Sequence, residues 1–152
     1  MNILLFNLYK KNNKIYTKSK IEKDIPILEF KGIIFSGDKS YPENLVLDLP
    51  NNKYIGPSGE YDDDINHSCN PNSRIEIVNT RAFLYSIKTI KPDEEITFDY
   101  STIIKSDYCF DCNCKSFNCR KKISNIKSLN KDTFDKYKKL KMIPTFILRF
   151  YE

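Results

Sequence analysis

The sequence of 152 residues predicts a mainly β fold, with helix at its C-terminal end. Apolar and β-branched residues gather in many short runs, which is the pattern of strands. Turn-forming residues such as Gly, Pro and Asn separate most of these runs. Near the C-terminus the apolar residues instead recur at helical spacing. Together these observations favour many short strands followed by a helical segment.

The first half of the chain is predicted to contain five strands. They cover residues 3–9, 15–21, 25–30, 33–35 and 44–49. A polar turn at residues 10–14 separates the first two strands, and Gly32 marks a bend before the fourth. Pro50 and Asn51 end the fifth strand, because proline cannot donate to a strand ladder. A turn signal at residues 56–59 follows.

The second half contains three more strand-like runs and then the helical segment. The runs cover residues 75–78, 83–87 and 96–100. The apolar residues near helical spacing in the final segment, 131–151, are Phe134, Tyr137, Leu140, Ile143 and Ile147. Pro144 lacks a backbone N–H, so we expect it to divide this segment into two helices.

The composition predicts an intracellular globular domain. No stretch approaches the roughly 20 apolar residues of a membrane span. Residues 3–9 are too short for the core of a signal peptide, and no basic residue precedes them. We therefore expect cytoplasm or nucleus, where thiols stay reduced. The five cysteines are an odd number, which argues against a disulfide framework.

The net charge of +5 is unevenly distributed. A lysine-rich stretch at residues 121–141 contains Lys121, Lys122, Lys127, Lys131, Lys136, Lys138, Lys139 and Lys141. A solvated helix face explains such a stretch, and contact with nucleic acid or another acidic surface is the alternative. The acidic run at residues 62–64 either forms a solvated turn or attracts a basic peptide.

Four cysteines lie close together after the predicted strands. Cys112, Cys114 and Cys119 fall within eight residues, and Cys109 lies just upstream. In a reduced protein this density of thiols indicates a metal site, and thiolates in tetrahedral geometry suit Zn²⁺. These four cysteines form one possible ligand set. The alternative is that some of these cysteines are inert buried thiols.

Two other motifs precede these cysteines. The first is Asn66-His67-Ser68-Cys69-Asn70-Pro71-Asn72, which contains the single histidine of the chain. The second is Glu94-Glu95-Ile96-Thr97-Phe98-Asp99-Tyr100. A Cys/His nucleophile is disfavoured, because no second histidine is present. Glu94 and Glu95 are adjacent and would point to opposite faces of a strand, so they do not form a carboxylate pair.

In this order and spacing, the three motifs resemble SET-domain protein lysine methyltransferases over roughly residues 12–123. The resemblance implies a β-clip fold of short strands, with the SET domain at residues 1–108. A zinc-binding post-SET segment would follow at residues 109–123, and a helical tail at residues 124–152. The zinc ligands implied by the resemblance are Cys69, Cys112, Cys114 and Cys119.

The resemblance also implies methyl transfer from S-adenosylmethionine to a lysine amine of a protein, such as a histone or another basic protein. Tyr100 would be the catalytic residue that orients the amine, and Phe98 would line the lysine channel and leave room for more than one methyl group. The implied cofactor-binding residues are Asn66, His67, Ile15 and Tyr16.

The sequence departs from the family pattern at the start of the resemblance. Residues 12–16, Asn-Asn-Lys-Ile-Tyr, occupy the position where the family has Gly-x-Gly, and Asp93 replaces a usual glycine. Asparagine tolerates the left-handed backbone region that glycine adopts freely. This departure leaves two other functions open: a catalytically weak SET-like module that binds protein or chromatin, and a zinc-stabilised basic protein that binds nucleic acid. In the methyltransferase interpretation nucleic acid is an indirect partner.

Overall fold

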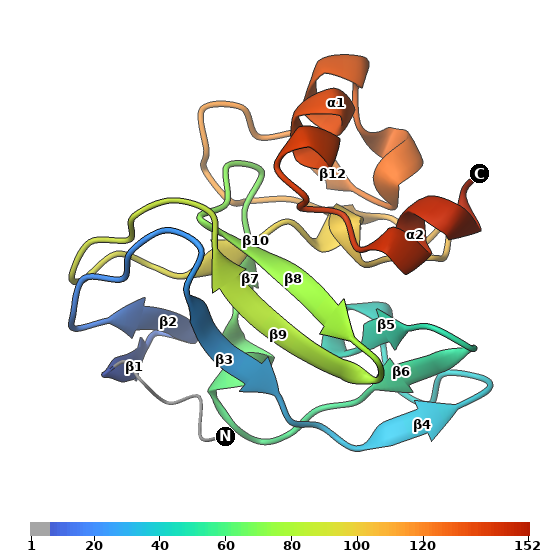
Figure 1. Ribbon diagram of the computed structural model, residues 1–152, viewed down its shortest axis with the longest axis horizontal. Coiled ribbons are helices and arrows are strands. Elements are labelled where there is room, and N and C mark those ends of the chain that lie inside the picture. The colour runs from blue at the N-terminus through green and yellow to red at the C-terminus, as the bar shows by residue number, and fades with distance from the viewer. Residues whose placement is uncertain (1–6) are drawn as a thin grey trace.

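Short strands form five small sheets in the computed structural model, which describes residues 7–152 (Figure 1). Antiparallel hairpins pair β1 with β2 and β11 with β12, and a parallel pair joins β7 to β10. The two larger sheets have the orders β3-β9-β8 and β4-β6-β5. The strands are β1 Leu8–Lys11, β2 Lys14–Thr17, β3 Pro26–Phe30, β4 Ile34–Ser36, β5 Leu47–Leu49, β6 Lys53–Ile55, β7 Asn66–His67, β8 Ser73–Val78, β9 Arg81–Ser86, β10 Thr97–Phe98, β11 Phe110–Asp111 and β12 Lys122–Ile123.

The main core lies against the sheet β3-β9-β8. Leu84 of the central strand β9 is paired with Leu28 of β3 and Ile75 of β8, and its side chain is wholly buried. Ile15 of β2 and Ile96 are also wholly buried in this core, and the amide of Ile96 donates to the carbonyl of Ile15. The hairpin β1-β2 is therefore fixed to the segment that leads into β10.

Two short helices form the C-terminal part and have a smaller core of their own. Helix α1 spans Lys131–Lys139, and the side chain of Asn130 caps it by accepting from the amide of Thr133 at 2.8 Å. Helix α2 spans Thr145–Phe150. Tyr137 and Ile147 are buried in a cluster with Met142 and Ile143. Packing of this apolar face, more than local propensity, holds such short helices in place.

The mainly β fold and the C-terminal helices agree with the sequence-based expectation. Pro144 does separate two helices. Leu140, which was expected on the apolar face, is instead 38% exposed just after α1. Of the first predicted strand, residues 3–6 lie outside the described residues, and β1 begins at Leu8.

Three predicted strands are shorter than expected. The stretch 44–49 begins as a 3₁₀ turn at Glu43–Leu45, because Pro42 fixes the preceding φ at −54° and starts a turn. The stretch 15–21 leaves strand pairing after Thr17. The stretch 96–100 ends early, because the Asp99 carboxylate accepts from the amide of Ser101 and starts a 3₁₀ turn at Tyr100–Thr102. Within residues 7–152 no helix has the length and apolar character needed to cross a membrane.

Candidate functional site

The parallel pair β7-β10 brings the two central motifs together. Asn66 lies opposite Thr97, and His67 lies opposite Phe98. Asn72, at the other end of the first motif, also joins the two motifs through hydrogen bonds of its side chain. Its amide nitrogen donates to the carbonyl of Glu95 at 2.7 Å, and its side-chain oxygen accepts from the amide of Thr97 at 3.0 Å. Residues about 30 positions apart in the sequence thus form one rigid unit.

Tyr100 lies two residues after β10, at the start of the 3₁₀ turn Tyr100–Thr102, and points into the interior. Its hydroxyl donates to the carbonyl oxygen of Ile65 at 2.8 Å. The ring packs against Phe98, with centroids 4.8 Å apart, and against Phe110 at 6.1 Å. Burial, followed by the nearby charges of Asp64 and Glu95, raises the pKa of Tyr100 well above its usual value. The hydroxyl is therefore neutral at physiological pH and donates in a fixed direction.

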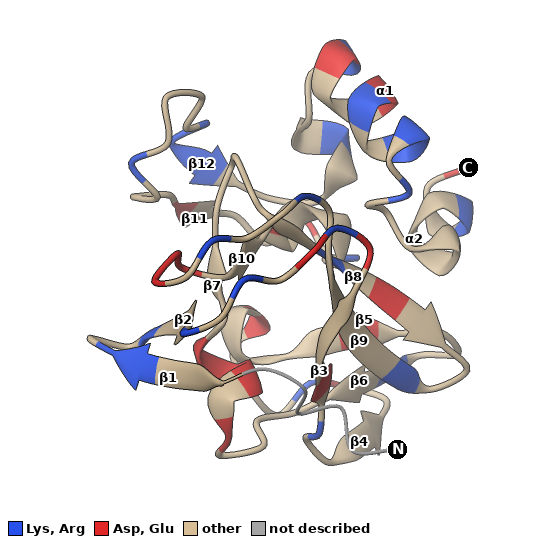
Figure 2. Ribbon diagram, turned by 60° about the vertical axis from the view of Figure 1, so that its left-hand side comes forward, with Lys and Arg blue, Asp and Glu red and all other residues tan. Residues whose placement is uncertain are grey.

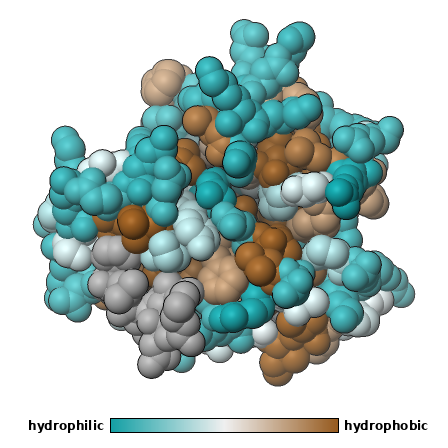
Figure 3. All heavy atoms as spheres, in the orientation of Figure 1, coloured by the Kyte–Doolittle hydropathy of each residue, from teal (hydrophilic) through white to brown (hydrophobic). Residues whose placement is uncertain are grey.

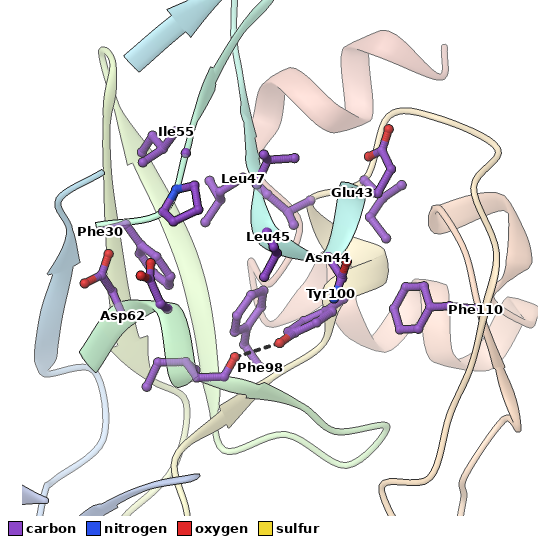
Figure 4. A pocket seen from close by; sticks show the side chains of 17 residues that line it. Phe30, Glu43, Asn44, Leu45, Leu47, Ile55, Asp62, Phe98, Tyr100 and Phe110 are labelled. Atoms are coloured by element: carbon purple, nitrogen blue, oxygen red, sulfur yellow. Dashed lines mark hydrogen bonds between the residues drawn. The ribbon is translucent and has the colours of Figure 1, made fainter. Parts of the chain in front are cut away.

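A narrow apolar cavity of about 170 Å³ lies on one side of Tyr100 (Figure 4). Aromatic rings and aliphatic side chains form most of its wall, among them Phe30, Leu47, Ile55, Phe98 and Phe110. Figure 4 shows Phe98 and Tyr100 side by side at its lower end, below Leu45. A long aliphatic side chain fits such a space better than a polar group does.

Acidic side chains lie beside this cavity. Glu43, Asp62 and Asp63 contribute to its lining. Asp62 is buried, and its carboxylate accepts from the hydroxyl of Ser58 and the amide of Lys31. Burial raises the pKa of Asp62, which these hydrogen bonds oppose. The acidic run therefore serves a structural role through Asp62 and adds carboxylates to the cavity lining, whereas Glu43 is paired with Lys39 at 2.7 Å.

Tyr100 also lines a larger, more polar cavity of about 680 Å³. Its wall is formed by the β1-β2 turn, the first motif and the segment 111–115. Three residues line both cavities, namely Asn44, Tyr100 and Phe110. The narrow apolar space and the wide polar space therefore meet at the Tyr100 side chain. This arrangement suits a reaction between a group in one cavity and a group in the other.

The β1-β2 turn has the backbone conformation that glycine would supply. Asn12 and Asn13 have φ values of 53° and 56°. The carbonyl of Asn13 accepts from the side-chain amide of Asn66 at 2.9 Å, so the turn is tied to the first motif. Asparagine adopts this left-handed conformation at lower cost than most residues. The turn therefore has the left-handed conformation without glycine.

The structure brings most of the predicted site residues together, and two of them lie apart. Asn66, His67 and Tyr100 line the polar cavity, and Phe98 lines the apolar one. The predicted cofactor residues Ile15 and Tyr16 line neither cavity. Ile15 is wholly buried in the core, and Tyr16 stacks on Tyr9 with centroids 5.4 Å apart. The side chains of Asn12, Asn13 and Lys14 contribute to the lining in their place.

Several residues of the site were not identified from the sequence. Phe30, Asn44 and Phe110 line the cavities, although no motif marks Phe30 or Asn44. Phe110 is close in sequence to the cysteines, which is a weak signal. Glu95 lines the polar cavity and binds Lys14 at 2.9 Å, whereas Glu94 accepts from the backbone amide of Lys91 at 3.0 Å.

Asp99 is the centre of a buried network that joins the site to the C-terminal segments. It binds the guanidinium of Arg120 at 2.6 and 2.8 Å and accepts from the Tyr137 hydroxyl at 2.7 Å. Burial opposes ionisation of Asp99, but the bonds to Arg120 prevail and hold the pKa of Asp99 below its usual value. The segment after the cysteines and helix α1 are therefore both attached to the residue that precedes Tyr100.

Three cysteines and the histidine form a compact cluster. The ligand atoms of His67, Cys69, Cys112 and Cys114 all lie within 4.8 Å of one another. The sulfurs of Cys69 and Cys112 are 3.8 Å apart. A tetrahedron with zinc–sulfur bonds of about 2.3 Å has edges of roughly 3.8 Å. The spacing and the soft donors therefore fit a zinc ion.

The hydrogen bonds of His67 bear on whether it is a ligand. The amide of Tyr100 donates to Nδ1 of His67 at 3.1 Å, so Nδ1 is unprotonated. Burial lowers the pKa of His67 to about 4, and the ring is neutral. The remaining proton is then on Nε2, which lies 3.2 Å from the sulfur of Cys69. In this tautomer His67 donates to Cys69, so both of its ring nitrogens are engaged and the sulfurs of Cys69, Cys112 and Cys114 are the donors of the cluster left for a metal ion.

The two other cysteines differ in position. Cys119 packs against Cys69 and Cys112, and its thiol donates to the carbonyl of Cys112 at 3.6 Å. The amide of Arg120 donates to the sulfur of Cys69 at 3.4 Å. Cys109 is exposed and lies outside the cluster. Between the two ligand sets considered from the sequence, this geometry favours the one that includes Cys69.

Comparison with known proteins agrees with the family resemblance seen in the sequence motifs. The family model of the SET domain matches residues 12–101. The histone-lysine N-methyltransferase Set2 of Drosophila melanogaster is 43% identical over 60 residues, which are 37% of this chain and 3% of Set2. The histone-lysine N-methyltransferase ASHH3 of Arabidopsis thaliana is 36% identical over 63 residues, which are 39% of this chain and 17% of ASHH3. The chain thus matches only a small part of the length of these relatives.

A solved structure has the same fold. KRYPTONITE in complex with mCHG DNA and SAH superposes with a TM-score of 0.63 at 23% sequence identity. The superposition covers 78% of this chain and 29% of the KRYPTONITE chain. At this level of identity the similarity establishes the fold alone.

Proposed function

Because the chain belongs to the SET-domain family, we propose that it transfers methyl groups from S-adenosylmethionine to a lysine amine of a protein. The observation that carries this proposal is the meeting of two unlike cavities at Tyr100. One is narrow and apolar, as a lysine side chain requires, and the other is wide and polar, as a nucleoside with an amino-acid tail requires. Tyr100 lies at their junction, where a methyl group would pass.

The polar cavity supplies suitable groups for S-adenosylmethionine. The residues that would hold it are Asn13, Asn66, His67 and Glu95, all of which line this cavity. The bound cofactor supplies a methyl group on a positively charged sulfur. Glu95 would favour that charge. The chain holds Asn66 in place through the carbonyl of Asn13, so the cavity wall is formed before binding.

The apolar cavity would prepare the lysine amine. A lysine with an ordinary pKa near 10.4 needs about 4.6 kcal/mol to lose its proton at pH 7. Aromatic walls such as Phe30, Phe98 and Phe110 disfavour the ammonium form and reduce this requirement. The Tyr100 hydroxyl donates its hydrogen bond to the carbonyl oxygen of Ile65. The hydroxyl oxygen can therefore accept a hydrogen bond from the amine. Holding the amine in one orientation is the main contribution to the rate.

The same site has no need for a strong base. The single histidine uses Nδ1 to accept from the Tyr100 amide and Nε2 to contact Cys69. Neither nitrogen is left to take a proton from the substrate. Proton loss to solvent before transfer, followed by methylation of the neutral amine, is compatible with this arrangement.

We infer that Cys69, Cys112, Cys114 and Cys119 bind one structural zinc ion. The close sulfurs of Cys69, Cys112 and Cys114 support this inference, and Cys119 packs against the same cluster. A closed site of four thiolates stabilises the fold and leaves no open position for catalysis. Its role would be to attach the segment 110–120 to the first motif, where this segment forms part of the polar cavity.

A basic protein, such as a histone in the nucleus, is the proposed substrate. The relatives are named histone-lysine N-methyltransferases, and KRYPTONITE has been solved with an H3(1–15) peptide and SAH. In this chain Glu43, Asp62 and Asp63 lie beside the lysine cavity and would favour a cationic peptide.

The test is transfer of a labelled methyl group to histone H3, with the lysine-to-arginine version of the H3 tail as the matched control. Mass spectrometry should find methyl-lysine in the first protein alone. A thermal shift with S-adenosylmethionine separates the catalytically weak alternative. At 100 times Kd we expect about 2.7 kcal/mol of stabilisation, or roughly 5–10 °C for a protein of this size. No shift, together with no methyl-lysine, would reject the enzyme in favour of a binding module.

A further inference from the structure

A groove lies between the edge strand β8 and the two C-terminal helices. It has a volume of about 1330 Å³ and is the largest of the cavities described here. Its walls come from β8, the β5-β6 turn, the end of α1 and α2. It shares no lining residue with either cavity at Tyr100. The proposed methyltransferase site therefore does not account for this groove.

The groove is strongly basic. Its cationic lining residues are Arg74, Lys105, Lys138, Lys141 and Arg149. One acidic residue, Glu76, is among the lining residues, and it is bound to Arg74 at 2.7 Å. The other four cations form no ion pair with any residue of the described range 7–152. Figure 2 shows blue segments along α1, in the turn that follows it and on α2.

The positions of these cations distinguish the groove from a simple solvated helix face. They come from three separate parts of the chain: β8, the segment at Lys105 and the two helices. Lys138 and Lys141 are the only residues of the lysine-rich stretch 121–141 that line the groove. Two other lysines of that stretch form ion pairs with nearby residues: Lys131 pairs with Asp135, and Lys122 pairs with Asp111. The fold therefore places two lysines of the basic stretch beside cations from other parts of the chain.

The groove also offers neutral donors and apolar surface. Asn51, Asn52, Asn79 and Thr145 contribute amide and hydroxyl groups to its lining. Phe150 is 57% exposed, and the ammonium of Lys105 lies 5.8 Å from the centre of its ring. Figure 3 shows apolar surface between hydrophilic side chains on the face that carries β8 and β9. Cations, neutral donors and an exposed aromatic ring are the groups that contact a nucleic-acid backbone and its bases.

We propose that this groove binds the phosphate backbone of a nucleic acid. Nucleic acids carry a higher linear density of negative charge than an acidic peptide, so they gain the most from four unpaired cations in one groove. The exposed ring of Phe150 would favour unpaired bases over a closed duplex. Because the groove and the Tyr100 cavities have separate linings, a nucleic acid and a protein substrate can bind at the same time.

The test measures binding of a fluorescent 20-base-pair duplex and of its single strand at several salt concentrations. The groove variant combines Lys138→Gln, Lys141→Gln and Arg149→Gln. The control variant combines Lys20→Gln, Lys23→Gln and Lys88→Gln, which are exposed, lie outside the groove and change the net charge equally. Urea unfolding checks that both variants are folded, and the single variant Lys141→Gln replaces the triple if that one is unstable.

The groove variant should lose affinity and salt dependence. The slope of log K against log salt should fall by about 0.9 for each lost duplex contact, or about 0.7 for a single strand. The control variant should keep the wild-type slope, and the single strand should bind more tightly than the duplex; tighter binding of the duplex would contradict the role given to Phe150. Equal losses in both variants, no binding to either DNA below about 100 μM, or tighter binding of polyglutamate than of DNA would each overturn the proposal. Methylation of a free peptide should be the same in wild type and groove variant, so this result is independent of the methyltransferase assay.

Discussion

Tyr100, Asn44 and Phe110 each line both cavities, so single side chains determine how the two spaces communicate. Tyr100 was predicted from its motif, whereas Asn44 was not, because its position depends on a turn that forms only in the folded chain. The same holds for the turn at Asn12 and Asn13. The residue types suggest a tolerated left-handed conformation, and the structure adds the bond from Asn66 that gives this turn a role.

Asn13→Ala should weaken both folding and cofactor binding. A residue with a Cβ in the left-handed region costs about 1–2 kcal/mol unless, like asparagine, it has compensating local bonds. We expect a loss of about 1 kcal/mol in the free energy of unfolding, measured with urea, and weaker binding of S-adenosylmethionine. Asn13→Gly is the matched control and should bind the cofactor as wild type does. Equal affinities for Ala and Gly variants would show that this backbone conformation does not matter.

Asp99→Asn should destabilise the protein strongly. It leaves the buried guanidinium of Arg120 without its anionic partner, which typically costs about 3–5 kcal/mol. Tyr137→Phe removes one bond to the same carboxylate and should cost about 1.5–3 kcal/mol. The pKa of Asp99 is lowered in the folded state, so its stabilising effect is present above the unfolded value of about 3.9 and is lost as pH falls further.

Unfolding of the wild type between pH 3 and pH 7 tests the sign of this effect. The free energy of unfolding should drop more steeply toward low pH in the wild type than in Asp99→Asn. Parallel curves for the two proteins would contradict the assigned role of Asp99.

At the scale of elements, the sequence predicted the strand-rich core better than the strand ends. Apolar and β-branched runs locate β3, β8 and β9, because these strands supply residues such as Leu28, Ile75 and Leu84 to the main core. The short pair β7-β10 was not predictable from local pattern. Each strand has two residues, and its pairing depends on segments about 30 residues apart. Motif resemblance located these residues, whereas only the fold shows how they meet.

The cysteine cluster also depends on how distant segments meet in the fold. Local spacing pointed to Cys109 as the fourth ligand, and only the family resemblance implied Cys69. Sequence distance does not report that the sulfurs of Cys69 and Cys112 approach to 3.8 Å. Cys69→Ser should reduce bound zinc from one ion per chain to well below one, as measured by elemental analysis of the purified protein. Cys109→Ser is the matched control, since its side chain is exposed, and should keep the full ion. Loss of zinc in the second variant with retention in the first would refute the assignment.

At the scale of the whole molecule, three separate segments converge behind Tyr100. The cysteine segment contacts Cys69, Arg120 binds Asp99, and Tyr137 of α1 binds the same carboxylate. The fold class and the helical tail were predictable from composition and spacing, because both depend on patterns along the chain. The convergence of the three segments was not predictable from the sequence. It depends on the buried Asp99 and on its partners Arg120 and Tyr137, which no sequence motif connects to it.

The central claim is that Tyr100 promotes methyl transfer between the two cavities. Its most direct test is the single-turnover rate of lysine methylation at saturating S-adenosylmethionine, comparing wild type with Tyr100→Phe. We predict a rate lower by about 10²-fold or more, which is typical for loss of one well-placed polar group, with unchanged cofactor affinity. Equal rates in the two proteins would contradict the account.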